Sequence, residues 1–562
     1  MYQDATGSQP RSPERDEVAD SRIVHESVSP PSSQSEGSHS RTSPGSPAAA
    51  AEWVSVLFAT PSSDDRPTRL TDAADITDLA LNQVLATIID DADRDELLPY
   101  FLAGLRQPDD VRFRHEVWRD LEDASLVESL AQFAAALHQV DLRLQWSRDT
   151  RFNEERLSWY LDAALRYCHA IAVLYGVLEG ASPRSRGLTA VRDYLSLYTN
   201  DPAFVALRDD ATAARHELDQ IRYSLTIRGA TVRVGVFGGD DEYAAEIRAL
   251  FERFNQGGAT TTYRVAYRDS YSMNHVEAAI ANRVAKLFPH AFATLTAFES
   301  AHGTFVTSSI RRLASEFKVY TSYHQFMKRF QPLELDFSLP EIVSSGDGVE
   351  VHDAFDVALA NKLVRQSAKV VTNSFRLGPT ERVIVVSGPN QGGKTTFARM
   401  VGQVYYLAAR GLPVPGSSAR LSLVDEVFTH FSRAENNTMQ AGKLEQDLVR
   451  MKDILRRATS SSVVIANEVF SSTTVSDAVT LGTLALQRFV SLGCRCVYVT
   501  FVDELSRLDP AIISMVSTID PVDATIRTFK ILPRPADGRA YALVIAEKYD
   551  LTYDQIRARV GS

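Results

Sequence analysis

The sequence predicts a multidomain protein in which an all-α region, interrupted by a small α+β insertion, precedes an α/β domain with a P-loop. Apolar residues recur at helical spacing from about residue 79 to residue 222, almost without strand signals. The pattern changes to alternation within 223–268 and returns to helical spacing as far as residue 330. After residue 346, strand-like runs alternate with helices, which is typical of a largely parallel, buried sheet.

Composition and charge restrict the class of protein. Hydrophobic residues make up 44% of the chain and charged residues 23%, which is typical of a soluble globular protein. No apolar run approaches a membrane span, and residues 1–52 lack the basic start and apolar core of a signal peptide, so we expect a cytoplasmic protein without a membrane partner. The formal net charge of −11 argues against a generally basic nucleic-acid-coating protein but leaves room for a local basic patch.

The three cysteines predict buried, reduced thiols. Their number is odd, and Cys494 and Cys496 stand two apart in an apolar run of strand type, on one face. Neither a disulfide framework nor a metal site is therefore expected from them, and Cys168 is expected to be a buried thiol as well.

The domain boundaries follow from changes in composition and period. Residues 1–52 are rich in Ser, Pro and charge and cannot bury enough apolar surface to offset their ordering entropy, so we expect a disordered tail. Helices are predicted over 53–222, a small α+β insertion over 223–268, returning helices over 269–345 and the P-loop domain over 346–562. The elements predicted before residue 346 are helices at 79–89, 96–105, 113–121, 125–145, 153–178, 188–198 and 202–224, a hairpin at 225–228 and 231–236, a helix at 243–254, a strand at 261–267, and helices at 276–287, 291–300 and 307–330.

Basic residues on the last of these helices, among them Arg311 and Lys318, allow two interpretations. Solvated helix charge is the default, and a row that faces DNA is the alternative.

The segment 383–396 carries the clearest chemical signal. Four β-prone apolar residues lead into G-x-x-x-x-G-K-[ST], and a helical pattern follows directly, which is the context that a phosphate-binding loop requires. Glycines let backbone N–H groups approach phosphate oxygens, and the positive end of the following helix faces the same anion. We therefore predict that the chain binds ATP with Mg²⁺ through Gly388, Pro389, Asn390, Gln391, Gly392, Gly393, Lys394, Thr395 and Thr396.

Within this loop, two side chains have predicted roles of their own. Lys394 is expected to reach the β- and γ-phosphates, and the Thr395 hydroxyl is expected to hold Mg²⁺.

A second strand, at 462–466, ends in Asn467 and Glu468. An ATPase of this type needs an acidic residue toward Mg²⁺ and a general base toward the attacking water at this point. Asn467 replaces the expected aspartate: its carbonyl can accept a hydrogen bond from a metal-bound water, but it supplies no charge. Glu468 is the candidate general base, and a glutamate that merely ends a strand is the alternative.

The motifs around the loop resemble those of the MutS family. The loop is similar to the family's G-P-N-M-G-G-K-S-T, and the segments at 425–430, 467–474 and 500–505 resemble its D-x-I-F-T-R, D-E-L-G-R-G-T-S and T-H-Y-H-E-L segments. Asn373 stands where the family has an asparagine shortly before the loop's strand. The resemblance covers residues 346–562.

Upstream the resemblance is weaker. Residues 113–121 are similar to the start of the family's core helices, and the helix–small domain–helix order across 200–330 is similar to its lever and clamp. Residues 274–278 resemble a smaller MutS-related branch that lacks the amino-terminal domains. No segment before residue 113 resembles the family's mismatch-reading domain.

The resemblance implies both an architecture and a function. It implies a helical core and lever with a reduced clamp at 223–268, followed by an ABC-type P-loop ATPase domain. It further implies a homodimer in which the partner chain completes each site, and which closes on duplex, mismatched or branched DNA in DNA mismatch repair or recombination.

Three residues depart from the family pattern. The serine that the family offers across the dimer to the γ-phosphate aligns with Gly442, the switch-loop histidine aligns with Phe501, and Asn467 replaces an acid. These changes leave ATP binding in place and predict slow hydrolysis. Two other interpretations stay open: a nucleotide-switched dimeric scaffold that barely hydrolyses ATP, and a dimeric clamp whose target is a protein.

Overall fold

A computed structural model describes residues 54–60, 72–238, 272–366, 368–432, 442–520, 526–536 and 551–560, all of which belong to one compact unit, residues 45–562. The expected disordered tail over 1–52, and the expected helix and strand at 243–254 and 261–267, lie outside the described residues.

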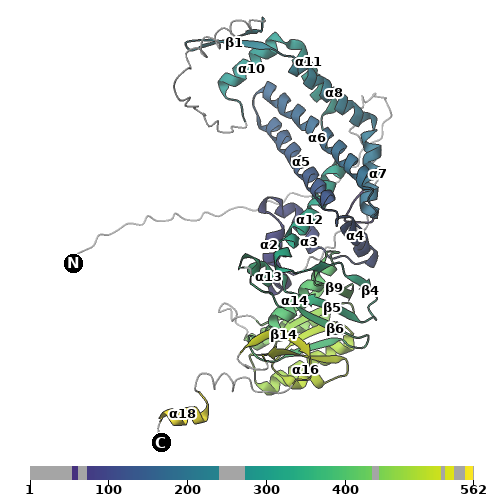
Figure 1. The fold of residues 1–562 in the computed structure, drawn as a ribbon, viewed down its shortest axis with the longest axis vertical. Helices are drawn as coiled ribbons and strands as arrows, with labels where there is room; N and C mark the ends of the chain where they lie inside the picture. Colours follow the sequence, from purple (N-terminus) through teal and green to yellow (C-terminus); the bar gives the residue numbers. More distant parts are fainter. Residues whose placement is uncertain are drawn as a thin grey trace, which may run out of the picture. The chain divides into compact units, whose positions relative to one another are not determined.

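The first part of the described chain is helical, as the apolar periodicity predicts (Figure 1). Its helices are α1 (Ala73–Asp78), α2 (Leu81–Ile88), α3 (Arg94–Leu102), α4 (Pro108–Asp120), α5 (Ala124–Asp149), α6 (Asn153–Ala181), α7 (Arg186–Thr199) and α8 (Pro202–Asp219). The predicted helix at 79–89 corresponds to α2, and the short helix α1 before it was not predicted; Ala80, in a left-handed conformation with φ 54°, separates the two.

Side-chain caps begin several of these helices. Asp123, Ser185 and Asp201 each accept a hydrogen bond from a backbone N–H in the first turn of α5, α7 and α8 respectively. Helix α10 (His275–Leu287) opens with a full capping box formed by Asn274 and Glu277. Then follow α11 (Pro289–His302) and α12 (Ser308–Lys328).

The longest helix, α6, has 29 residues, which corresponds to about 40 Å at 1.5 Å per residue. It packs side by side with α5 (Figure 1). Among the described residues it is the one helix long and apolar enough to cross a membrane, a property that the sequence analysis did not identify. Half of its apolar window is buried inside the protein, as in a core helix.

The predicted hairpin is confirmed. Strands β1 (Tyr223–Arg228) and β2 (Thr231–Val236) pair antiparallel, and Gly229 makes the turn with φ 57°. Helix α8 ends at Asp219, before the predicted end of its helix, because the alternating strand pattern takes over at Tyr223.

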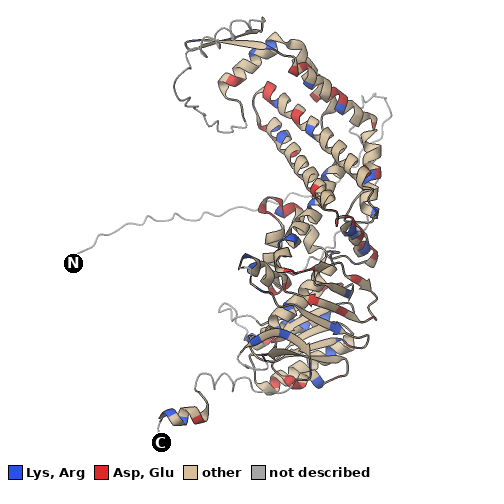
Figure 2. Ribbon diagram, viewed as in Figure 1, with Lys and Arg blue, Asp and Glu red and all other residues tan. Residues whose placement is uncertain are grey.

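The charged residues of the helices are of mixed sign (Figure 2). On α12, Arg311 pairs with Asp141 of α5 at 2.7 Å, and Lys318 pairs with Asp93 and Glu96 at 2.8 and 3.1 Å. These two basic residues therefore serve contacts between helices, which weakens the interpretation of a DNA-facing row.

The second part of the described chain is an α/β domain around a six-stranded sheet in the order β10-β11-β12-β7-β13-β14. The strands are β7 (Val383–Ser387), β10 (Val427–Phe431), β11 (Val463–Asn467), β12 (Arg495–Val499), β13 (Ile512–Ile519) and β14 (Arg527–Pro533). The first five are parallel and β14 is antiparallel to β13, so the predicted largely parallel sheet is confirmed.

Helices cover both faces of this sheet. Alternate residues of β7 point to opposite sides: Ile384 and Val386 pack in one apolar cluster with α14 (Lys394–Ala408), and Val383 and Val385 in another with α15 (Lys443–Arg457) and α16 (Val475–Leu492). A β-strand that is buried on both faces has a continuous run of apolar residues, and this is why the sequence predicts β7.

A second, four-stranded sheet has the order β4-β9-β5-β6, with β4 (Glu341–Val343), β5 (Val349–Ala354), β6 (Asn373–Leu377) and β9 (Ser418–Ser422). Strand β3 (Phe337–Ser338) pairs with β8 (Val414–Pro415). Both β3 and β4 precede residue 346, where the sequence analysis places the domain boundary, yet their partners lie far inside the second domain. A strand of two or three residues is too short for its alternating pattern to be recognised in the sequence.

The remaining described elements are α13 (Val357–Leu363), α18 (Tyr553–Val560) and the short 3₁₀ turns at Asp91–Asp93, Gln331–Leu333, Val364–Gln366 and Asp503–Arg507. Cys168, Cys494 and Cys496 are free and buried, as predicted.

Candidate nucleotide-binding site

The predicted phosphate loop connects the end of β7 to the start of α14. Gly388 and Gly393 have φ values of 113° and 90°, which L-residues rarely adopt, and Gly393 caps α14. A Cβ on Gly392 would lie 2.1 Å from the Ser517 Oγ of β13, and one on Gly388 would lie 3.0 Å from the Ser517 carbonyl oxygen. The glycines are therefore required by the close passage of β13 as well as by an incoming phosphate.

Lys394 lies within this loop. Its Nζ donates hydrogen bonds to the carbonyl oxygens of Gly388 at 2.9 Å and Pro389 at 3.1 Å, and its side chain is buried. Burial lowers the pKa of Lys394, and the nearby carboxylate of Glu468 opposes this effect. The ammonium group is thus held at the loop by carbonyl dipoles, where an anionic phosphate would be a stronger partner.

The predicted metal-binding pair is brought together. The Thr395 hydroxyl donates a hydrogen bond to Asn467 Oδ1 at 3.0 Å, across 72 residues of sequence. Asn467 is buried at the end of β11, beside Phe431 of β10 and Val499 of β12. A hydroxyl and a carboxamide oxygen are ligands of the type that Mg²⁺ accepts, directly or through water, so the pair fits this ion.

Glu468 follows directly, in a left-handed conformation with φ 53°, and its N–H donates to the Val499 carbonyl oxygen at 3.0 Å. This turn away from the strand direction places Glu468 in the lining of the same cavity as Lys394 and Thr395. A non-glycine residue with positive φ is uncommon, and such strain is often found at functional sites.

The cavity itself has a volume of about 550 Å³. Its lining combines the polar phosphate loop with apolar side chains. The apolar side chains are those of Leu359, Leu363, Val370, Val371 and Phe529. A site that offers both a phosphate-binding loop and apolar surface fits a nucleotide, whose base is planar and weakly polar and whose phosphates are charged.

Sequence reasoning missed Phe529, which reaches the cavity from β14. Asn373 fixes this contact: its Nδ2 donates to the Phe529 carbonyl oxygen at 3.1 Å, and its Oδ1 accepts from the Ile531 N–H at 2.8 Å. Asn373 was noted only as part of a resemblance, and the structure supplies its physical role. No local motif around residue 529 signals a binding residue.

None of the three departures from the family pattern is among the described residues that line this cavity, although Asn467 adjoins it through the Thr395 hydroxyl. Among the described residues that line the cavity, neither Gly442 nor Phe501 appears. Gly442 caps the start of α15, and Phe501 is 52% exposed just after β12.

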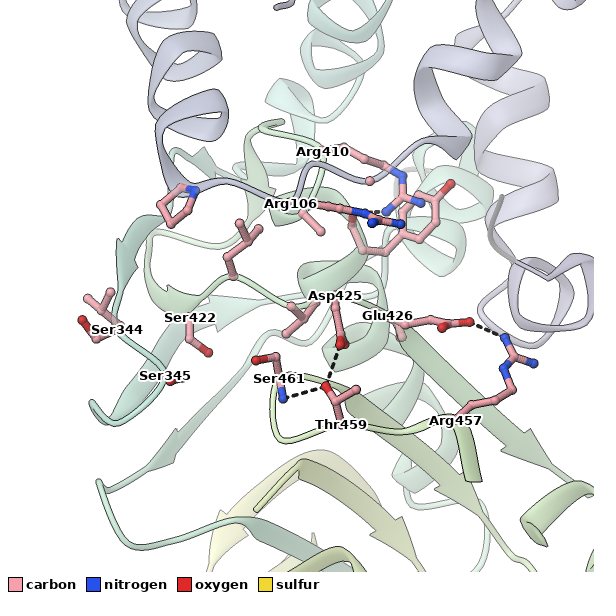
Figure 3. Close-up of a pocket in the computed structure, with 18 of the residues that line it drawn as sticks. Arg106, Ser344, Ser345, Arg410, Ser422, Asp425, Glu426, Arg457, Thr459 and Ser461 are labelled. Atoms are coloured by element: carbon pink, nitrogen blue, oxygen red, sulfur yellow. Dashed lines mark hydrogen bonds and ion pairs between the residues drawn. The ribbon is translucent and has the colours of Figure 1, made fainter. Parts of the chain in front are cut away.

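A second cavity, of about 520 Å³, lies near the amino ends of β10 and β11 (Figure 3). Its two carboxylates already have partners: Asp425 accepts hydrogen bonds from Thr459 and Ser462, and Glu426 pairs with Arg457. Parallel sheets bind nucleotides at the carboxyl ends of their strands, which is where the first cavity lies.

Comparison with known proteins adds a family match. Residues 384–556 match the model of MutS domain V. The DNA mismatch repair protein MutS of Zymomonas mobilis is 33% identical over 149 residues, which cover 26% of this chain and 17% of that protein. The proteins of the same name from Desulfovibrio desulfuricans and Brevibacillus brevis are 32% identical over 186 residues and 26% identical over 219 residues.

These alignments are partial. They cover 32% and 38% of this chain for the last two relatives, and 20% and 25% of the relatives themselves. The chain thus spans a quarter or less of the length of the curated relatives that it matches.

Proposed function

We propose that this chain, which belongs to the MutS family through its domain V, is an ATP-binding and DNA-binding protein of DNA repair or recombination. In this proposal the chain forms a homodimer that closes on duplex, mismatched or branched DNA when ATP and Mg²⁺ bind, and it hydrolyses ATP slowly. The relatives are DNA mismatch repair proteins by name, and mismatch repair is the first process in which to test this chain.

One observation carries the nucleotide part of the proposal. Lys394, the Thr395–Asn467 pair and Glu468 come from two segments more than 70 residues apart in sequence and line or adjoin one cavity at the carboxyl end of a parallel sheet. Residues placed at such a position supply phosphate contact, a metal ligand and a carboxylate, which are the three requirements of ATP hydrolysis.

In the proposed mechanism each side chain has a separate task. Lys394 leaves the loop carbonyls and pairs with the β- and γ-phosphates. Thr395 and Asn467 would hold Mg²⁺, which would supply positive charge against the triphosphate. Glu468 accepts a proton from the attacking water. Asn467 contributes an oxygen without a negative charge, so Mg²⁺ is held less strongly than by an aspartate, and this supports slow hydrolysis.

The test is ATP turnover by the purified protein, with and without duplex or junction DNA, beside Glu468→Ala and Lys394→Ala variants. We expect slow turnover that DNA stimulates, loss of turnover with retained ATP binding in Glu468→Ala, and loss of ATP binding in Lys394→Ala. Unchanged turnover in Glu468→Ala would exclude that residue as the base, and unchanged ATP affinity in Lys394→Ala would exclude the site.

A second function, a nucleotide-switched scaffold that binds ATP and barely hydrolyses it, is favoured by the neutral side chain of Asn467 next to Thr395. The Asn467→Asp variant separates the two. If the missing charge limits hydrolysis, this variant binds Mg²⁺ more tightly and turns ATP over faster than the parent. If it stays inactive while it binds ATP, the scaffold function is preferred.

The nature of the target is tested separately. Contacts to phosphates release counterions, so DNA binding must weaken steeply as salt rises, and a shift assay at two salt concentrations measures this. Absence of any salt-dependent DNA binding would favour a protein target.

A further inference from the structure

Helix α1 is short, but its side chains are placed between two elements of the ATPase domain. Thr429 of β10 donates two hydrogen bonds to Asp75 Oδ1, from its N–H at 2.8 Å and from its hydroxyl at 2.7 Å. The same hydroxyl lies 2.7 Å from Asp78 Oδ2, which also accepts from Arg450 Nη2 of α15 at 2.6 Å. Asp75 is 5% exposed, so these contacts are made out of water.

This group of four residues, Asp75, Asp78, Thr429 and Arg450, is here called the α1 latch. It is not a surface ion pair: the Asp78 and Asp75 side chains are 6% and 7% exposed. Hydrogen bonds that involve buried charged groups are stronger than neutral surface ones, and loss of one partner leaves the other without compensation.

From the latch, β10 leads directly to the nucleotide site. Thr429 lies two residues before Phe431, which stands opposite Asn467 in the parallel register. The next N–H, that of Ser432, donates to the Asn467 carbonyl oxygen at 3.2 Å. Two hydrogen bonds, joined by the backbone from Thr429 to Ser432, therefore connect Asp75 to Asn467, which in turn accepts the Thr395 hydroxyl of the proposed metal-binding pair.

The residue that follows α1 contacts α14, the helix that begins at the phosphate loop. Leu79 packs against α14 at Gly402, where a Cβ would lie 2.4 Å from the Leu79 Cδ2. Gln403 of α14 donates from its Nε2 to the Leu79 carbonyl oxygen at 2.9 Å. Helix α14 begins at Lys394, so residues 75–79 contact both the helix that carries the phosphate loop and the strand beside Asn467.

On its other side, this segment continues into the helical region. Helix α2 follows α1 directly and packs against α12 and α13. Thr87 of α2 accepts a hydrogen bond from Asn361 of α13 at 2.9 Å. At the start of α1, Asp72 pairs with Arg457 at the end of α15 at 2.8 Å. The segment therefore has ATPase elements on one side and the long helix α12 on the other.

We propose that Asp75 and Asp78 are positioning residues for ATP turnover, which tie the placement of β10 and α15 beside the nucleotide to the helical region through α1 and α2. This inference rests on the proposed ATPase function and deepens it. A nucleotide that moves the phosphate loop and the end of β11 shifts β10 and α14 together, and α1, attached to both, transmits the shift. The energetic coupling between DNA and ATP turnover is the quantity that tests this role.

The variants are Asp78→Asn, Arg450→Gln and their combination, with Asp75→Asn as a milder change that keeps the acceptor for Thr429. The matched control is Asp193→Asn, which removes an exposed partner of Arg192 within α7. Thermal melting first establishes that each variant is folded. ATP turnover is then measured across ATP and DNA concentrations, so that kcat and KM are separated.

We expect the latch variants to keep the KM for ATP within about twofold and to lose about fivefold or more of the stimulation of kcat by DNA, the lower range of ordinary coupling between sites. The combined variant should lose no more of this stimulation than either single variant, because both single variants break the same contact, the one between Asp78 and Arg450. Asp193→Asn should behave as the parent. Full stimulation in Asp78→Asn, or additive losses in the combined variant, would overturn the proposal.

A readout without turnover separates this proposal from the function on which it rests. In hydrogen exchange of the parent, a non-hydrolysable ATP analogue should slow exchange in the phosphate loop and also change exchange in α2 and α12; in Asp78→Asn the change should stay within the ATPase domain. ATP-dependent protection of the loop without any change in α2 and α12 of the parent would overturn the latch and leave ATP binding intact. Failure of the parent to bind ATP would overturn both.

Discussion

At the residue scale, the phosphate loop depends on how closely Ser517 approaches it. The Ser517 hydroxyl donates to the Gly392 carbonyl oxygen at 2.7 Å, and no room remains for a side chain at residue 392. The loop is thus shaped by a neighbour 125 residues away in sequence. The G-x-x-x-x-G-K-[ST] motif leaves residue 392 unspecified, and the contact with Ser517 gives a physical reason for the glycine there.

The Gly392→Ala substitution should therefore weaken ATP binding by distorting the loop, with the fold retained. Adding Ser517→Ala removes the oxygen at 2.1 Å and should restore part of the affinity, although the Ser517 Cβ stays at 3.1 Å. Titration of a fluorescent ATP analogue measures both effects. Equal affinities for Gly392→Ala with and without the second change would show that Ser517 is not the obstacle.

Glu316 is a second residue whose environment makes a prediction. It is fully buried in α12 and accepts hydrogen bonds from the Ser55 hydroxyl at 2.8 Å and the Val56 N–H at 2.7 Å, which fasten the segment 54–58 to the helix. Burial raises the pKa of Glu316 to about 7, while these hydrogen bonds and Arg312 oppose the rise.

The sign of the pH effect follows from this raised pKa. Between about pH 4.5 and pH 7 the folded protein holds the Glu316 proton more tightly than the unfolded chain, so this residue makes the free energy of unfolding fall as pH rises. A Glu316→Gln variant lacks the effect. Its Tm relative to the parent should therefore be higher at pH 8 than at pH 5, and a relative Tm that is independent of pH would contradict the assignment.

At the element scale, the contact between α14 and the α1–α2 junction depends on the absence of a side chain at residue 402. Leu79 and Ile465 both lie within 3.4 Å of the position of a Cβ on Gly402. Overpacking of a filled interior typically costs about 1–3 kcal/mol.

We therefore expect Gly402→Ala to lower the free energy of unfolding by about 1–3 kcal/mol, and Leu79→Ala in the same chain to recover part of the loss. Chemical denaturation of the single and double variants measures this. If Leu79→Ala adds its own cost without recovery, Leu79 does not supply the clash.

Elements with strong periodicity were predictable from the sequence. The predicted helix at 153–178 matches α6 apart from its last turn, and the one at 188–198 lies within α7, because long amphipathic or apolar patterns leave few alternatives. Strands β3 and β4 were missed because they are two and three residues long and exist only through their partners β8 and β9.

The same distinction applies to the site. The phosphate loop, Asn467 and Glu468 are local to motifs and were predicted, and the structure places them together. Phe529 lines the cavity only because β14 is held to β6 by Asn373, a long-range contact that no local pattern contains. The α1 latch is of the same kind, since Asp75 and Thr429 are 354 residues apart.

At the scale of the whole molecule, one apolar cluster extends through both the helical region and the ATPase domain. It contains Phe101 of α3, Trp118 of α4 and Tyr320 of α12 together with Val401 of α14 and Ile465 of β11. Buried hydrogen bonds reinforce the junction, among them Trp118 Nε1 to the Gly411 carbonyl oxygen at 3.1 Å and Tyr406 Oη to the Phe101 carbonyl oxygen at 2.8 Å.

Because the core is shared, the helices that contribute to it should unfold together with the ATPase domain. We expect a single calorimetric transition for these parts, which ATP with Mg²⁺ moves upward as a whole. The Lys394→Ala variant should lose the shift. Two separate transitions, of which ATP moves only one, would show that the shared cluster does not couple the two regions.

The burial of the cysteines also has a practical consequence. Burial raises the pKa of Cys168 and of Cys494 to about 12 and holds the pKa of the Cys496 thiol well above its usual range, so the native thiols carry little of the reactive thiolate near neutral pH. A maleimide dye should leave the native chain unlabelled. Cysteines introduced at exposed positions, such as Leu197 on α7 and Leu484 on α16, which are 65% and 59% exposed, would then be the sites of attachment. Changes in distance between the helical region and the ATPase domain can thus be followed by fluorescence without replacing any native cysteine.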